Sequence, residues 1–401
     1  MRNIARWASV LLIFTIPWED SISVSSLGSL ARAMGLVVAG LWMATILLEG
    51  RFRKPHAFHA LVLIFFLWNF ASIFWSPDVD TTVQRIKTYS QIFLLLLIFW
   101  EFFETSEHLM AGLQAYVLGA YVLVASALYN YASGTVAVAY EGRYSATGVN
   151  AVDLALILMI GLPLAMQLFF VAGKGAKGLF WKLLNLAFIP LAVFAIILTG
   201  SRTSLIAIVP FGIFLVTTGK IPLNRKMQIF AILLAAALML LPFVPSSVTS
   251  RLSTLGSSIE AGDLGGRVAL WLDSIKLLAA HPFFGIGSGA LDMAIGSAAH
   301  NTFVSVATET GTFGFLLFFL MLVIVFHEAA NLPNGNAGLW LAVFFTWVIG
   351  VLSLSWEFRK LTWVVLNLIV IEGSIIRDRR LAALAEKHAA ANQPPVIAFV
   401  D

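Results

Sequence analysis

The stretch that decides the fold is NAVDLALILMIGLPLAMQLFFVA, residues 150–172, in which Asp153 is the only charged side chain. A helix that crosses the hydrocarbon core of a membrane needs about 20 mostly apolar residues, so this stretch is long enough. The whole chain has the same character: of 401 residues, 60% are hydrophobic and 11% are charged, and the mean hydropathy is +0.91. Soluble domains carry about 25% charged residues. The sequence therefore predicts an all-α, polytopic membrane protein.

Apolar runs separated by charged or Pro/Gly/Asn-rich breaks predict about twelve membrane-spanning helices. They cover residues 5–18, 27–48, 57–75, 86–103, 109–131, 150–172, 183–199, 203–219, 227–244, 302–326, 337–355 and 361–376. We expect the first to be a retained span, because no small-residue cleavage site follows it. Residues 1–376 then form a single transmembrane domain, followed by a short tail, residues 377–401. One long loop, residues 245–301, lies between the ninth and tenth spans and is expected to carry part of the active site.

Positive charges in the short connections predict the orientation. Lys and Arg collect in the second, sixth and eighth connections and at both ends of the chain, whereas the first connection contains Glu19 and Asp20 and the third contains Asp78 and Asp80. Because Lys and Arg are retained on the cytoplasmic side, both termini are predicted to be cytoplasmic. The loop of residues 245–301 is predicted to lie outside.

Composition also excludes several kinds of chemistry. The chain has no cysteine, which rules out disulfides, thiolate catalysis and thiolate metal sites. The spacing of the other potential ligands predicts no metal site. The net charge of +4 is accounted for by the basic connections and tail, so it does not indicate nucleic-acid binding.

The predicted topology leaves two of the seven histidines on the outer side. His281 precedes Pro282 at the end of an amphipathic stretch, a position where His is favoured by the helix dipole. His300 lies where the long loop re-enters the membrane, and Asn301 beside it is an amide that can hold an imidazole or a substrate hydroxyl. His300 is thus a candidate base, with an interfacial capping role as the alternative.

Two outward arginines accompany this histidine. Arg202, in TGSRTSL, occupies a very short outer turn, where an arginine is disfavoured unless it has a partner. Arg267 heads GGRVALWLDSIKLL, in which Val268, Trp271, Leu272, Ile275 and Leu278 recur at helical spacing; we expect a helix in or near the outer interface. Arginine suits bidentate contact with phosphate. The pattern indicates a diphosphate held by arginines, with a base nearby.

Further polar and aromatic residues on the outer side have two interpretations each. The basic ones either contact substrate or snorkel as interfacial anchors: Arg85, Lys87, Arg143, Arg251, Arg359 and Lys360. Glu357 and Arg359, in one outer turn, either pair with each other or position substrate. Trp271 either lines a lipid path or belongs to the interfacial aromatic belt. Glu309 lies nine residues after His300, about 2.5 helical turns, and is expected to be a polar core contact.

Four motifs in order resemble the bacterial O-antigen ligase and polymerase superfamily. Its pattern of His-Asn, nine residues and Gly-x-x-Gly is met by His300, Asn301, Gly311 and Gly314. TGSRTSL resembles the Gly-Ser-Arg turn of that family, GRYSATGVNAVDLALIL its outward Gly-Arg to Asn segment, and LSLSWEFRKLTWVVLNL its penultimate outer turn. The resemblance covers roughly residues 140–370.

The resemblance implies a metal-independent, membrane-embedded glycosyltransferase without a cofactor, in the bacterial inner membrane with its active site facing the periplasm. The donor would be a glycan on undecaprenyl diphosphate. The expected acceptor is lipid A-core, as in O-antigen ligation; the alternative is an O-antigen or exopolysaccharide polymerase that joins lipid-linked repeat units. A transporter or flippase is a third possibility, but the polar groups collect at one face and the two halves of the chain do not match. We expect no nucleic-acid partner, membrane lipids as surroundings, and a monomer.

The resemblance also implies roles for particular residues. Arg202 and Arg267 would hold the donor diphosphate and stabilise its growing charge, and His300 would take the proton of the acceptor hydroxyl in an inverting reaction. These three are the expected catalytic residues. The expected substrate-binding residues are Asn301, Arg143, Arg85, Glu357, Arg359 and Trp271.

Overall fold

The computed structural model describes residues 1–24, 28–136, 142–219, 222–253 and 266–391, and most of them are helical. The α-helices are α1 (Arg2–Thr15), α2 (Leu30–Glu49), α3 (Ala57–Ala71), α4 (Val79–Phe102), α5 (Ser106–Ala132), α6 (Ala151–Val171), α7 (Gly175–Leu198), α8 (Arg202–Ala207), α9 (Val209–Thr217), α10 (Leu223–Leu240), α11 (Ser246–Ser253), α13 (Arg267–Ala280), α14 (Leu291–Ile295), α15 (Thr302–Ala330), α16 (Asn334–Val351) and α17 (Lys360–Ala391). Two 3-10 turns, η1 (Ser72–Phe74) and η3 (Leu241–Phe243), extend α3 and α10. The strands β1 (Ser23–Val24) and β2 (Gly28–Ser29) pair antiparallel.

A helix or a pair of helices coincides with each of the twelve apolar segments, and the all-α, polytopic class is confirmed. Within the described part of the chain, seven helices are long and apolar enough to cross a membrane: α2, α3 with η1, α5, α6, α7, α10 with η3, and α15. The α8–α9 pair and α16 are apolar but shorter. The number of twelve spans therefore stays a prediction.

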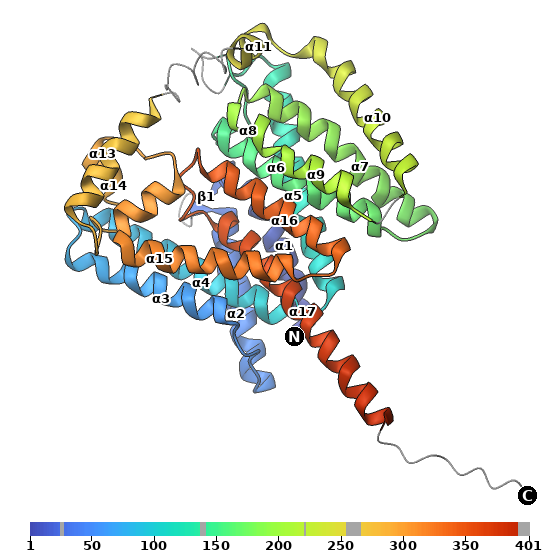
Figure 1. Cartoon of the computed structure of the whole chain (residues 1–401), viewed down its shortest axis with the longest axis horizontal. Coiled ribbons are helices and arrows are strands. Elements are labelled where there is room, and N and C mark those ends of the chain that lie inside the picture. Colours follow the sequence, from blue (N-terminus) through green and yellow to red (C-terminus); the bar gives the residue numbers. More distant parts are fainter. Residues whose placement is uncertain (25–27, 137–141, 220–221, 254–265, 392–401) are drawn as a thin grey trace, which may run out of the picture.

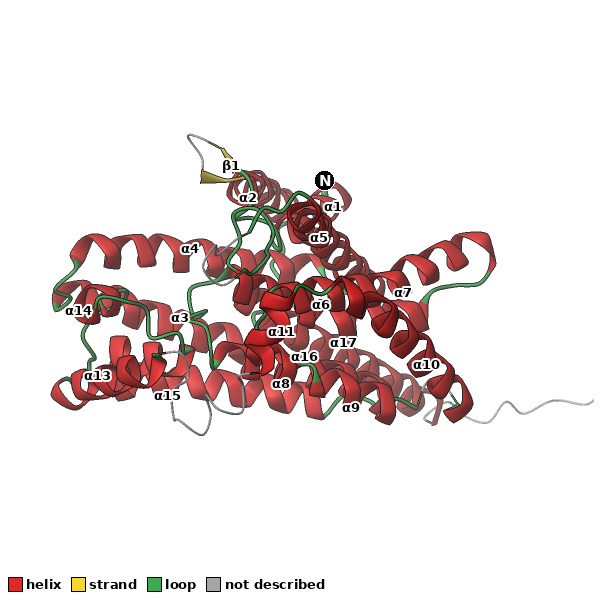
Figure 2. Ribbon diagram, turned by 90° about the horizontal axis from the view of Figure 1, so that it is seen from above, coloured by secondary structure: helices red, strands yellow, loops and turns green. Residues whose placement is uncertain are grey.

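Helix α6 lies at the centre of the helical packing. In its most apolar window 83% of the residues are buried, against 22% for α2, and its hydrophobic residues surround the axis, which is typical of a helix without a solvent face. Helix α6 packs against α5, α7 and α16. Helix α16 in turn contacts α9 and α15 and so connects the α5–α10 side of the molecule to the side formed by α3, α4, α13, α14 and α15 (Figures 1 and 2).

Helix α15 is broken at Gly311, whose backbone has φ 67° and ψ −175°. The break frees the carbonyl groups of residues 308–310, and a buried carbonyl needs a replacement donor. Neighbouring groups supply these donors: Ile286 N to Thr308 O (3.0 Å), Gly287 N to Glu309 O (2.9 Å) and Trp68 Nε1 to Thr310 O (2.9 Å). The segment of residues 282–289 and helix α3 therefore fix the first half of α15.

Glycine is required at this break because two backbones touch. A Cβ atom on Gly311 would lie 2.3 Å from the carbonyl oxygen of Phe283, and one on Gly285 would lie 2.4 Å from the carbonyl oxygen of Glu309. Residues 285–289, with the sequence GIGSG, thus form the irregular segment that packs against the break in α15.

The chain end differs from the expected short tail. Helix α17 continues from the predicted span through residue 391 without interruption, because residues 377–391 are rich in the helix formers Ala, Leu, Glu, Lys and Arg; Figure 1 shows this end of α17 projecting from the rest of the molecule. Residues 392–401 lie outside the described part of the chain, as do residues 254–265 of the long loop.

Replacement of Gly311 by alanine tests the break in α15. We expect Gly311→Ala to lower stability by more than about 2 kcal/mol, because its backbone conformation is essentially restricted to glycine and the added Cβ would meet the Phe283 carbonyl. Thermal unfolding of the purified protein in detergent measures the effect. Gly40→Ala in α2 is the control: its Cβ meets nothing within 4 Å, and stability should rise by up to about 1 kcal/mol. Equal melting temperatures for the two variants would contradict the prediction.

Candidate functional site

A polar cavity of about 280 Å³ lies where the first turns of α6, α13, α14 and α15 meet α4 and the turn between α16 and α17. Its ionisable lining residues are Arg85, Arg143, Asp153, Arg267, Asp292, His300, Glu309, Glu357 and Arg359. Six of the expected site residues are therefore brought together: His300, Arg267, Arg143, Arg85, Glu357 and Arg359. The other three, Arg202, Asn301 and Trp271, do not line this cavity.

His300 is held in an unusual backbone conformation. Its φ is 50°, the left-handed region, and it is the only non-glycine residue with positive φ in the described ranges. Such conformations persist where surrounding contacts enforce them and occur preferentially at functional sites. The preceding residue is fixed by a hydrogen bond that Trp271 Nε1 donates to the carbonyl oxygen of Ala299 (2.9 Å). The backbone around His300 thus helps to fix the position of the imidazole in the cavity lining.

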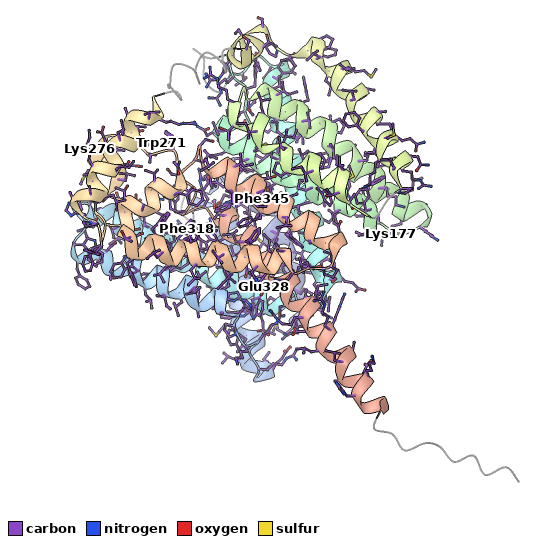
Figure 3. All side chains as sticks on the ribbon, in the orientation of Figure 1. Lys177, Trp271, Lys276, Phe318, Glu328 and Phe345 are labelled. Atoms are coloured by element: carbon purple, nitrogen blue, oxygen red, sulfur yellow. The ribbon has the colours of Figure 1, made fainter. Side chains whose placement is uncertain are left out.

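Asn301 and Trp271 support His300 from the two sides. The Oδ1 atom of Asn301 accepts hydrogen bonds from the backbone N–H groups of Phe303 (3.0 Å) and Val304 (3.2 Å), so Asn301 is the N-cap of α15. Trp271 lies on α13 (Figure 3) and its indole holds residue 299. The Oδ1 atom of Asn301 and the indole N–H of Trp271 thus make backbone contacts, and the substrate-binding roles expected of the two residues stay predictions.

The surroundings of His300 favour its neutral form. Burial lowers the pKa of the imidazole, and the positive charge of Arg267 lowers it further, against the opposite effects of Asp292 and Asp153. A neutral imidazole retains a lone pair that can accept a proton. The cavity therefore presents a potential base at neutral pH.

A cluster of arginines surrounds the turn of residues 199–201. Arg143 Nε donates to the carbonyl oxygen of Thr199 (2.7 Å), and Arg251 Nε donates to that of Gly200 (3.2 Å). Arg202 Nε donates to the carbonyl oxygen of Arg251 (3.4 Å). Burial lowers the pKa of Arg267, and Arg143 and Arg251 lower it further, which places Arg267 in the same positive field. Concentrated positive charge of this kind attracts an anion.

The two arginines that the sequence singled out are placed differently. Arg267 is the first residue of α13 and lines the cavity, whereas Arg202 is the first residue of α8, contacts Arg251 and is not part of the lining. Arg143, which was expected only to bind substrate, takes the place beside Arg267 in the lining. Helices α6, α13 and α15 also begin at the cavity, and the partial positive charges of their N-termini add to the field.

Arg359 connects three parts of the chain. Its Nη1 atom lies 2.6 Å from Asp20 Oδ2, and its Nη2 atom lies 3.2 Å from Asp153 Oδ2. Asp153 also accepts a hydrogen bond from Trp356 Nε1 (2.8 Å). The alternative in which Arg359 pairs with Glu357 is therefore wrong: its carboxylate partners come from the segment after α1 and from α6.

Glu309 and Glu357 face the cavity from α15 and from the α16–α17 turn. Glu309 is buried, as expected for a polar core contact, and its Oε2 atom accepts a hydrogen bond from Gly289 N (2.8 Å). Its place in the cavity lining was missed, although an ionisable residue inside an apolar span is by itself a functional signal. The same signal applies to Asp153 in residues 150–172. Within the described ranges, no group of three or more His, Asp or Glu side chains is arranged to hold a metal ion.

Comparison with known proteins agrees with this site. Residues 186–319, which contain Arg202, Arg267 and His300, match the family model described as O-antigen ligase. The chain is also 25% identical over 318 residues to the exopolysaccharide production protein ExoQ of Rhizobium meliloti (strain 1021), an alignment that covers 73% of this chain and 70% of that protein. The two matches support an O-antigen ligase-like superfamily member, and the resemblance to that superfamily is thereby confirmed.

The arginine cluster of this O-antigen ligase-like protein should bind a diphosphate without any sugar. We expect inorganic pyrophosphate to raise the melting temperature of the protein in detergent, because a ligand at 100-fold its dissociation constant stabilises the folded state by about 2.7 kcal/mol. Arg267→Gln should abolish most of the shift. Lys276→Gln should retain it, since Lys276 is exposed on the same helix (Figure 3) and pairs with Asp273. An equal shift with sulfate at matched ionic strength would argue against a diphosphate site.

Proposed function

We propose that the cavity transfers a glycan from undecaprenyl diphosphate to an acceptor hydroxyl. The observation that carries this proposal is the meeting of a base and two arginines in one cavity: His300, Arg267 and Arg143 all line it. Membership of the O-antigen ligase-like superfamily supports a lipid-linked glycan as substrate. The apolar helices around the cavity supply the membrane setting that a polyprenyl chain requires.

In the proposed reaction the acceptor oxygen bonds to the anomeric carbon of the donor sugar. The bond from that carbon to the diphosphate oxygen breaks with its electron pair, and undecaprenyl diphosphate leaves. Arg267 and Arg143 stabilise the charge that grows on the leaving group, and Arg202 and Arg251 extend the positive field behind them. A ring nitrogen of His300 takes the proton of the acceptor hydroxyl. Attack opposite the leaving group inverts the anomeric centre.

Two acceptors suit this chemistry. The match of residues 186–319 to a family described as O-antigen ligase favours lipid A-core, which was the expectation from the sequence. The similarity to an exopolysaccharide production protein covers much more of the chain, and an exopolysaccharide is not joined to lipid A. We therefore place the joining of lipid-linked repeat units first and ligation to lipid A-core second.

The proposed location is the bacterial inner membrane, with the cavity facing the periplasm and both termini in the cytoplasm. The distribution of basic residues supports this orientation. Arg2 forms ion pairs with Glu49, Glu101 and Glu104, so the basic N-terminus, the end of α2 and the end of α4 lie together. The cavity lies at the start of α6 and α15.

The first experiment measures product size. Purified protein is given undecaprenyl diphosphate-linked oligosaccharide, with and without lipid A-core, and the products are resolved by mass. We expect a ladder of repeat-unit masses without lipid A-core; a single addition seen only with lipid A-core would instead establish ligation. Arg267→Ala should reduce the rate by about 10²–10³, and His300→Ala should bind the donor without transferring it. The absence of a covalent product from the wild-type protein under both conditions would refute the proposal and favour a transporter.

The pH dependence of transfer tests the role of His300. Because burial and Arg267 lower the pKa of His300, the imidazole stays neutral below its ordinary pKa of about 6.5. The rate should therefore begin to fall only below that pH, as protonation removes the lone pair. In Arg267→Gln the remaining activity should begin to fall at a higher pH than in the wild-type protein, since one cause of the lowered His300 pKa is gone. Identical acid limbs in the two proteins would contradict the assignment of His300 as the base.

A further inference from the structure

Two buried carboxylates in the cavity have no role in the mechanism above. Glu357 is 2% exposed and Glu309 is 4% exposed, and both line the cavity. Buried glutamates are rare and are normally paired. Within the described residues, the arginines of the lining do not form ion pairs with these glutamates: no ion pair shorter than 4.0 Å joins either glutamate to Arg85, Arg143 or Arg267.

The carboxyl groups of Glu309 and Glu357 are not fully hydrogen-bonded. Glu309 Oε2 accepts from Gly289 N, but Glu357 Oε2 is buried without a hydrogen-bond partner among the described residues. Arg85 Nε is also buried without a partner there, and the Arg85 guanidinium lies 3.3 Å from the centre of the Phe358 ring. A buried acceptor and a buried donor left unsatisfied in one cavity indicate groups that a ligand completes.

The neighbouring side chains suit hydroxyl groups. Ser305 and Ser355 line the same cavity, and their Oγ atoms lie 2.9 Å apart. Carboxylates accept hydrogen bonds from hydroxyls, while serine and arginine can donate to them. A carboxylate brought here by a ligand would be the third carboxyl group beside those of Glu309 and Glu357. Burial and the charge of Glu309 raise the pKa of Glu357, so this part of the cavity resists further negative charge.

We propose that Glu357, with Glu309 and Arg85, forms a subsite that binds the hydroxyl groups of a neutral sugar and discriminates against an acidic sugar. This inference rests on the proposed glycan transfer, since it names the sugar class that the same cavity accepts. The cavity then has two subsites. Arg267 and Arg143 hold the diphosphate, and Glu357, Glu309 and Arg85 hold the sugar hydroxyls within reach of His300.

A binding experiment tests the subsite without requiring catalysis. The probe is the oligosaccharide released from its undecaprenyl diphosphate carrier by mild acid, and its counterpart is the same oligosaccharide oxidised to uronic acids at the primary alcohols. Binding to the full-length protein in detergent is followed by saturation-transfer NMR. We expect wild-type protein to bind the oxidised form at least tenfold more weakly. Equal affinity for the two forms, or no binding of the neutral form, would overturn the proposal.

Substitution of Glu357 then locates the discrimination. Glu357→Gln should weaken binding of the neutral oligosaccharide about tenfold and reduce the preference over the oxidised form. Glu328→Gln is the matched control, since Glu328 is a buried glutamate near the other end of α15 (Figure 3). It pairs with His56 and Arg377, and binding should be unchanged. Unaltered binding by Glu357→Gln would refute the subsite. Should that variant fail to fold, Arg85→Gln replaces it, and it should bind the oxidised form still more weakly than wild type does.

Kinetics identify which substrate supplies the sugar. In the transfer assay, Glu357→Gln should raise KM for one substrate: the donor if the subsite holds the donor sugar, and the acceptor if it holds the acceptor sugar. Unchanged KM for both would count against the subsite while leaving glycan transfer intact. Wild-type protein that binds the neutral oligosaccharide through Glu357 but transfers nothing would refute the proposed function and retain the subsite.

Discussion

The break of helix α15 at Gly311 is the constraint on which the site depends. A helix that loses its own hydrogen bonds at residues 308–310 must find other donors, and the segment of residues 282–289 supplies two of them while Trp68 supplies the third. This exchange ties the long loop to the first half of α15. The same half carries Glu309 and begins directly after His300. These three hydrogen bonds therefore help to set the position of the base, of one carboxylate and of the segment that follows α13.

Around this fixed segment, side chains of both charges line one cavity. Arginines from α13 and from the segment before α6 lie near the turn of residues 199–201, while carboxylates enter from α15 and from the α16–α17 turn. In a partly buried site, such charges interact more strongly than in water. A substrate with a diphosphate next to a polyhydroxylated sugar matches this division.

The helices were predictable because lipid imposes a strong rule: every backbone polar group must be satisfied within a segment, so apolar runs of sufficient length become helices. The meeting of His300 with Arg267 was also predictable, from the outward position of both residues. The sequence did not reveal that Arg202, Asn301 and Trp271 lie outside the cavity lining. Each of them hydrogen-bonds with the backbone, a kind of contact that sequence spacing does not show.

Composition and apolar periodicity by themselves determined an all-α membrane protein, and the His-Asn and arginine motifs determined its superfamily, because both properties depend on residues that are close in sequence. The tertiary structure decided which polar residues share a cavity. It placed Glu309 and Glu357, which are 48 positions apart in the sequence, in one cavity lining. It also paired Arg359 with Asp20 and Asp153 instead of Glu357. These pairings depend on how broken and unbroken helices pack, and that packing is settled by long-range contacts that no local pattern encodes.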